Sequence, residues 1–217
     1  MSVTPVGGTA PVFIDFAGGS SISQSVTVPA GCSRISVFVG LCPAGTIASR
    51  TVSAMTFNAA SFTQAAGSRV TSTDGTFTSA EWQELTSPAT GAHTFAATLT
   101  GTCRGGVYIC FDIGDTGLGA TGGAQDCVVA LSLAAASSSL VRFGCVFQPT
   151  GTPSLVPTAA GVYQLGFNKS ASAATRAVLT SYMRGYPDHP SCLTDGSGGG
   201  GVACSAIEIT GAADVIF

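Results

Sequence analysis

The chain has 217 residues, and its 8 Lys or Arg and 11 Asp or Glu make only 9% of it charged, against about 25% in an average soluble domain. The 45% apolar share is enough to bury a core, which excludes a disordered tail, and Gly, Ser, Thr and Pro interrupt every apolar run before it could span a membrane. The net charge of -3 and the scattered basic residues exclude a nucleic-acid-binding surface, so we expect neither nucleic acid nor a membrane as partner.

Alternating apolar and polar residues, rich in Val, Ile, Thr and Phe, predict strands along the whole chain. Residues 33–41 show the pattern well, with apolar side chains at every second position: Ile35, Val37, Val39 and Leu41. The expected strands are residues 11–16, 23–28, 33–41, 51–57, 62–66, 76–85, 93–99, 106–113, 127–133, 140–147, 162–168, 176–183, 202–209 and 215–217. We therefore predict an all-β protein, a β-sandwich or jelly-roll-like fold with about 12 to 14 strands in two antiparallel sheets.

The segments between the expected strands carry turn-forming residues, and the glycine-rich residues 114–123 are expected to be a linker or a long loop. Residues 1–11 lack a pattern and are expected to form an N-terminal arm, with 12–217 as a single β-sandwich domain. The sequence begins without a basic segment followed by an apolar one, so we expect synthesis in a cytoplasm without a signal peptide.

Histidine is the commonest acid-base and metal-binding side chain, and the sequence has two. His93 follows a turn and enters a strand, which favours an exposed edge position over a catalytic one. His189 lies close to Asp188 and Cys192, so a zinc site is conceivable there. Prolines on both sides of His189 fix an extended backbone, and structural zinc takes four ligands, so we expect no metal site and no cofactor.

Three aspartates flank the glycine-rich segment: Asp112, Asp115 and Asp126. Loop carboxylates of this kind bind calcium in some β-sandwiches. Calcium needs six to eight oxygen ligands, however, and the segment matches no calcium-binding loop. A solvated loop is therefore the favoured interpretation of these residues.

The three glutamates, Glu81, Glu84 and Glu208, show no pairing with a second acid of the kind that glycoside hydrolysis requires. Glu81 and Trp82 are neighbours in an expected strand, so their side chains point to opposite faces, and one could lie in the core with the other outside. The sequence also lacks a Gly-x-Ser-x-Gly nucleophile motif and a recognisable Cys–His signature. We therefore do not expect an enzyme.

Cysteine is frequent for a protein folded in a cytoplasm, and the even number of eight suggests disulfides. Cys32 and Cys42 bracket one expected strand and would lie about 34 Å apart, too far to bond to each other. The cysteines are Cys32, Cys42, Cys103, Cys110, Cys127, Cys145, Cys192 and Cys204.

Local spacing suggests which cysteines could pair. Cys192 and Cys204 flank a run of glycines, and a hairpin there makes them the favoured disulfide. Cys103 and Cys110 could pair only if the chain turned at the glycines between them. Cys145 shares an apolar face with phenylalanines and could be an inert core thiol. The alternative of eight buried, reduced thiols stays open.

Three phrases occur in an order that is typical of one class of module: Val28-Pro29-Ala30-Gly31, residues 52–62 (VSAMTFNAASF) and residues 82–95 (WQELTSPATGAHTF). Over about residues 20–210, the chain resembles β-sandwich modules of phage structural proteins and bacterial surface proteins. It departs from them in its many cysteines and in Ala59 or Ala60, where the modules have a second glycine.

The resemblance implies a non-enzymatic structural protein of a phage virion surface, either a capsid decoration or cement protein or a neck-associated subunit. Its partners would be other virion proteins of the capsid or neck and further copies of itself, with a trimer as one candidate homo-oligomer. Such a protein would be made in the host cytoplasm and located in the virion, where its thiols could form disulfides after release.

The alternative is a carbohydrate-binding or adhesive module, in which exposed aromatic rings stack on sugars. Its possible ligand contacts are Trp82, Tyr182 and Tyr186. A lone tryptophan within a strand is more often a core residue, whereas the two tyrosines lie near an expected loop. A row of exposed aromatic side chains would favour this alternative.

Overall fold

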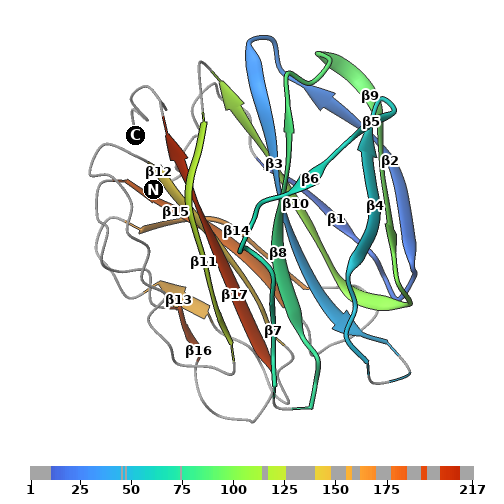
Figure 1. The fold of residues 1–217 in the computed structure, drawn as a ribbon, viewed down its shortest axis with the longest axis vertical. Helices are drawn as coiled ribbons and strands as arrows, with labels where there is room; N and C mark the ends of the chain where they lie inside the picture. The colour runs from blue at the N-terminus through green and yellow to red at the C-terminus, as the bar shows by residue number, and fades with distance from the viewer. Residues whose placement is uncertain are drawn as a thin grey trace.

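A computed structural model describes residues 11–44, 46, 48–73, 75–113, 117–125, 140–147, 155–157, 162–169, 177–184, 192–194 and 201–210. Every regular element in this part of the chain is a β-strand, and every strand pairing is antiparallel, which confirms the all-β prediction (Figure 1). The strands are β1 (Val12–Asp15), β2 (Ser21–Val28), β3 (Cys32–Pro43), β4 (Val52–Phe57), β5 (Ala60–Ser61), β6 (Thr63–Gln64), β7 (Val70–Thr71), β8 (Ser79–Thr86), β9 (Gly91–Leu99), β10 (Cys103–Ile113), β11 (Gly117–Gln125), β12 (Leu140–Phe147), β13 (Leu155–Pro157), β14 (Val162–Lys169), β15 (Ala177–Arg184), β16 (Cys192–Thr194) and β17 (Val202–Thr210).

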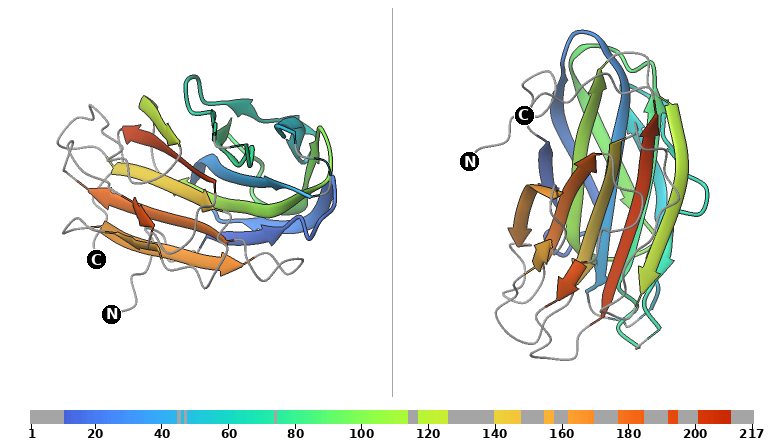
Figure 2. Two further views of the ribbon diagram at one scale, coloured as in Figure 1. Left: turned by 90° about the horizontal axis from the view of Figure 1, so that it is seen from below. Right: turned by 90° about the vertical axis from the view of Figure 1, so that its left-hand side faces the viewer.

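The strands form three large sheets and one small ribbon. Sheet A has the order β1-β10-β3-β8-β6, with β7 also paired to β8, and sheet B has the order β2-β9-β4-β5. Sheet C has the order β11-β17-β12-β15-β14, and β13 pairs with β16 in the ribbon. Sheet A is the middle layer, because its strands carry one buried cluster against sheet B and a second against sheet C (Figure 2).

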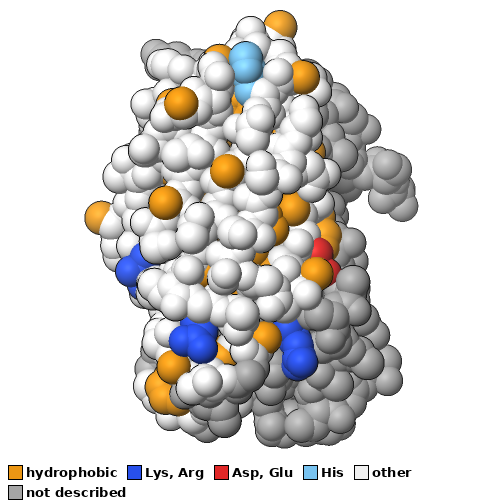
Figure 3. Space-filling model, turned by 90° about the vertical axis from the view of Figure 1, so that its right-hand side faces the viewer, with side chains coloured by type: hydrophobic (Ala, Val, Ile, Leu, Met, Phe, Trp, Pro, Cys, Tyr) orange, Lys and Arg blue, Asp and Glu red, His pale blue; other side chains and the backbone are white. Residues whose placement is uncertain are grey.

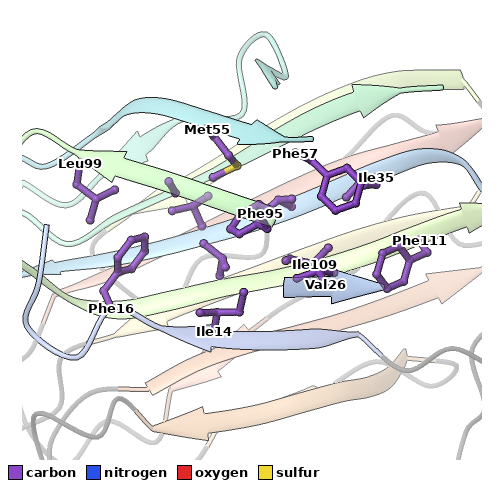
Figure 4. Packing of buried hydrophobic residues seen from close by; sticks show 14 of the residues in the cluster. Ile14, Phe16, Val26, Ile35, Met55, Phe57, Phe95, Leu99, Ile109 and Phe111 are labelled. Carbon is purple, nitrogen blue, oxygen red and sulfur yellow. The ribbon is translucent and has the colours of Figure 1, made fainter. Parts of the chain in front are cut away.

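The core between sheets A and B consists of aliphatic and aromatic side chains from both sheets (Figure 4). On β3 these are the apolar residues of the alternating pattern, Ile35, Val37 and Val39, all fully buried. They face Phe57 of β4 and Phe95 of β9 across the layer. Each large side chain removed from water in this way contributes about 1.5–3 kcal/mol to stability.

The core between sheets A and C uses the opposite face of the same strands. Phe38 and Trp82 lie directly opposite each other on β3 and β8, with ring centroids 5.4 Å apart, and Tyr108 of β10 is buried in the same cluster. Glycine allows sheet C to come close, because a Cβ on Gly144 of β12 would lie 2.5 Å from Cε2 of Phe38. Phe38 thus packs on the bare backbone of β12, and apolar side chains of sheet C complete the cluster: Val146, Ala203, Ile207 and Ile209.

The structure departs from the predicted architecture in the number of layers. The predicted β-sandwich is present, but sheet A is covered on both faces, so there are three sheets and a ribbon where two sheets were expected. Residues 117–125 form β11, although residues 114–123 were expected to be a loop. The expected strands at 127–133 and 215–217 and the arm up to residue 10 lie outside the described residues.

Candidate functional site: a buried ionic cluster between sheets A and C

Charged side chains meet in the layer between sheets A and C, on the face of β3 that carries Arg34, Ser36 and Phe38. Arg34 and Ser36 alternate with the apolar residues of β3 and therefore point toward sheet C. The strand register places Asp112 of β10 opposite Arg34, and it places Glu84 of β8 opposite Ser36. Strand pairing alone thus brings residues far apart in sequence into one group.

Sheet C supplies the fifth member of this group, Arg142 of β12. Its guanidinium forms an ion pair with Oδ1 of Asp112, while the hydroxyl of Ser36 donates a hydrogen bond of 2.7 Å to Oδ2. Arg34 pairs with Glu84 at 3.4 Å. We call Arg34, Ser36, Glu84, Asp112 and Arg142 the ionic cluster. Its two positive and two negative charges balance, as charges taken out of water must.

Burial within the cluster is nearly complete. The side chains of Asp112 and Arg142 are 2% and 10% exposed, and those of Arg34 and Glu84 are 8% and 24% exposed. Such a pair contributes little net stability compared with an apolar pair, but losing one partner is costly because the other charge stays buried. The ion pair between Asp112 and Arg142 therefore joins sheet A to sheet C in a specific position.

Two thiols lie beside the cluster. Burial raises the pKa of Cys110 from its ordinary value of 9.0 to about 11, with Arg142 opposing the shift and Asp112 adding to it. Burial also raises the pKa of Cys32, whose thiol donates a hydrogen bond to the carbonyl oxygen of Arg34. A thiol must lose its proton to act as a nucleophile, so this environment keeps both sulfurs unreactive near neutral pH.

The geometry of the ionic cluster is better suited to holding strands together than to catalysis. Both carboxylate oxygens of Asp112 have partners, one in Ser36 and one in Arg142. A serine nucleophile needs a base within hydrogen-bond reach, and the described histidine, His93, belongs to sheet B on the far side of sheet A. The Ser36 hydroxyl thus serves to hold the carboxylate in place.

A second polar group lies on the other face of β8. Glu81 is 3% exposed and forms an ion pair with Arg69, while the amide of Gln83 donates a 2.9 Å hydrogen bond to the other carboxylate oxygen of Glu81.

Trp82 of β8 is fully buried on the face toward sheet C, and its indole N–H donates a 3.0 Å hydrogen bond to the carbonyl oxygen of Ser205. The expectation that one of Glu81 and Trp82 could lie outside was wrong, because both faces of sheet A are covered.

The other predicted site residues have different positions. His93 was expected at an edge, but β9 lies between β2 and β4, where the half-buried ring packs edge-on against Phe57. Glu208 accepts a 2.8 Å hydrogen bond from the backbone N–H of Ala120. Asp112 was expected in a solvated loop and instead lies buried in β10. The remaining candidates lie outside the described residues or have side chains outside them: Asp115, Asp126, Asp188, His189, Tyr182, Tyr186, Cys127 and Cys192.

Among the described residues, a disulfide joins Cys145 to Cys204. These residues face each other directly across β12 and β17, with Cα atoms 4.2 Å apart, close to the narrow spacing of opposed antiparallel residues. The predicted Cys192–Cys204 pair is therefore wrong, and Cys145 is not a free thiol. The physical reason is that β17 pairs with β12, whereas Cys192 lies on β16, in the separate ribbon.

The other described cysteines are free and buried: Cys32, Cys42, Cys103 and Cys110. Cys103 and Cys110 cannot pair, because β10 runs straight through the glycines where a turn was needed. Cys32 and Cys42 lie at opposite ends of β3, as expected. The disulfide and the four thiols thus occupy different layers of the structure.

Sequence patterns did not predict the ionic cluster, although three of its charged residues lie within largely apolar strands. Arg34 and Arg142 are the single charged residues of β3 and β12, and Asp112 follows a run of apolar residues near the end of β10. A buried charge requires a counter-charge, so three such strands in a sequence with few charges suggest that they meet. Which charges pair depends on strand order, which local patterns do not contain.

Within the described residues, no group of three or more His, Cys, Asp or Glu side chains is arranged to hold a metal ion. The same part of the chain has no helix that is long and apolar enough to cross a membrane. Comparison with known proteins found no matching family model, no similar curated protein and no similar solved structure.

Proposed function

We propose that this protein is a non-enzymatic structural subunit of a phage virion surface, a capsid decoration or cement protein or a neck-associated protein. The observation that carries the proposal is how its buried charges are used. Asp112 is bound by Ser36 and Arg142, and Glu81 by Arg69, so these carboxylates hold strands and sheets in place. A layered fold whose strands and sheets are joined by buried ion pairs is suited to bearing mechanical load in an assembly.

The exposed surface supports the same proposal. The outer face of sheet B carries small neutral side chains, and the charged side chains visible on that side of the molecule are confined to its lower part (Figure 3). A neutral face can approach another protein closely without desolvating charges. The alternative, a carbohydrate-binding module, has lost Trp82 as a ligand contact because that side chain is fully buried.

The proposal is tested on purified virus particles from the source of the sequence. Quantitative mass spectrometry should find the protein in the particles in fixed proportion to the main shell protein, and gold-labelled antibodies should place it on the outside of the shell or at the neck. High abundance would indicate a decoration protein and a few copies a neck protein. Absence from washed particles, with the protein present in infected cells, would contradict the proposal.

A second experiment tests whether adding the protein back restores the stability of the shell. Shells stripped of this protein should lose heat resistance and recover it when purified protein is added back. A variant without this disulfide, with Cys145→Ala and Cys204→Ala, is the matched control that separates binding to the shell from reinforcement of the shell. It should still bind the shell, because the disulfide is buried in sheet C, but it should protect the shell less well.

A further inference from the structure

Strand β2 is a long, exposed edge of sheet B. It has eight residues, Ser21–Val28, and within the described chain it pairs only with β9, so its other side is open. In Figure 1 it forms the right-hand margin of the molecule. Ser21, Ser23, Ser25 and Thr27 are all exposed. An open strand side presents a row of backbone N–H and C=O groups that another strand can pair with.

The direction of these groups follows from the hydrogen bonds of β2. The N–H of Leu99 donates to the carbonyl oxygen of Ser20, so Ser20 and every second residue after it point their backbone groups at β9. The intervening residues, from Ser21 to Thr27, therefore point their N–H and C=O groups at the open edge. The register between β2 and β9 has no bulge, so this alternation holds along the whole strand.

The other described edges carry features that discourage pairing. β1 has four residues and ends at Asp15, while β5, β6 and β7 have two residues each. β4, β11 and β14 each have a register shift, and β14 also ends at Lys169. The ribbon strands have three residues each, and β13 ends at Pro157. Short length, bulges, charge and proline are the known ways to protect an edge, and β2 has none of them.

We propose that β2 pairs antiparallel with β2 of a second copy of this chain, which joins two copies of sheet B into one continuous eight-stranded sheet. If the twofold axis passes through Gln24, every outward-pointing residue gains a partner: Ser21 faces Thr27 of the second copy, and Ser23 faces Ser25. This register makes about eight backbone hydrogen bonds. It also places Ile22, which is only partly buried, opposite Val26 of the second copy.

Charge favours a second copy over an unrelated partner. β2 contains no ionisable residue, so two copies bring no like charges together across the seam. The same neutrality leaves nothing on the strand to select a charged peptide. A strand that pairs with itself needs this kind of self-complementary edge.

The first test compares Ser25→Pro with Ser25→Ala by sedimentation velocity up to about 1 mM protein, a range suited to the weak association expected of a single strand pair. Proline removes an outward N–H and no bond to β9, so the folded monomer should persist. The wild type and Ser25→Ala should dimerise, and Ser25→Pro should shift to monomer by at least tenfold in dissociation constant. A wild type that stays monomeric, or one that forms trimers, would overturn the proposal.

A second variant keeps the test valid if proline disturbs the fold. Gln24→Cys places two thiols opposite each other across the twofold axis, in the arrangement that Cys145 and Cys204 have within the chain. Mild oxidation should link this variant into covalent dimers. Thr94→Cys is the matched control, because Thr94 is exposed on β9, one strand inward, and about 16 Å from its copy. Equal cross-linking of the two variants would refute the β2 seam.

The choice of a second copy as partner rests on the proposed role in an assembly, but different experiments can refute the β2 dimer and the virion function independently. Dimerisation is measured on the isolated protein, and particle association on virions. A protein that dimerises through β2 yet is absent from particles refutes the proposed function alone. A monomer that is present in particles refutes the seam alone.

Discussion

The packing of Phe38 over Gly144 gives a quantitative test of the contact between sheets A and C. Phe38 is fully buried, and its ring occupies the space that a Cβ on Gly144 would need. Gly144→Ala therefore forces either the ring or the β12 backbone to move. Gly to Ala in a strand normally gains about 0.5–1 kcal/mol from reduced chain entropy, so any net loss measures the steric clash.

The magnitude follows from the geometry. Overpacking in a dense core costs about 1–3 kcal/mol, so Gly144→Ala should lower the free energy of unfolding by that amount. Phe38→Ala leaves a cavity and should cost about 3–5 kcal/mol. In the Phe38→Ala background the new methyl group enters empty space, so the double variant should be no less stable than Phe38→Ala alone.

The assay is urea unfolding of the four proteins, followed by the fluorescence of the single tryptophan, Trp82, which lies beside Phe38. The double-mutant cycle should give a favourable interaction energy of about 1–3 kcal/mol between the two substitutions. Additive losses within about 0.5 kcal/mol would refute the reasoning, because they would mean that the methyl group does not compete with the ring.

Three further predictions concern buried polar groups and the disulfide. Asp112→Asn should destabilise the protein by about 3–5 kcal/mol in thermal or urea unfolding, whereas combining it with Arg142→Met should recover part of the loss; a double variant worse than either single would contradict the ion pair. Replacing Cys145 and Cys204 by alanine opens a loop with a sequence separation of 59 and should cost about 4 kcal/mol, and peptide mapping without reductant should recover these two cysteines linked. Burial raises the pKa of Cys110 from 9.0 to about 11, so the unfolded chain loses this proton at a lower pH than the folded chain does. The free energy of unfolding should therefore fall by up to about 3 kcal/mol as pH rises from about 9 to 11. Cys110→Ala should flatten that decline, and an unchanged decline would assign it to other groups.

Local pattern predicted the strands well, because alternation and turn residues are local properties. Residues 140–147 were predicted with the observed bounds of β12, and the strand at 33–41 lies within β3. Alternation separates the two faces of a strand but does not say what covers each face. Arg34 and Ser36 look like a solvent face in sequence, yet they are buried because their partners come from residues far along the chain.

Pairing between distant strands was beyond what the sequence could provide. Cys145 and Cys204 meet because β12 and β17 are neighbours, and nothing local encodes that order. The glycines of β11 are typical of a loop in sequence, but in the structure they mark close contacts: a Cβ on Gly119 would lie 2.6 Å from Cδ of Glu208. Glycine at such positions reflects crowding by neighbouring side chains, which only the tertiary structure reveals.

The double coverage of sheet A has a consequence for synthesis. The strands of sheets A and B have all been made once the ribosome passes Ile113, but β17, which covers Trp82, ends roughly 100 residues later. At about 5–20 residues per second, one face of sheet A stays uncovered for about 5–20 s in every new chain. Fast translation or a chaperone that holds this face should therefore raise the yield of folded protein, and a chain stopped after β10 should aggregate through it.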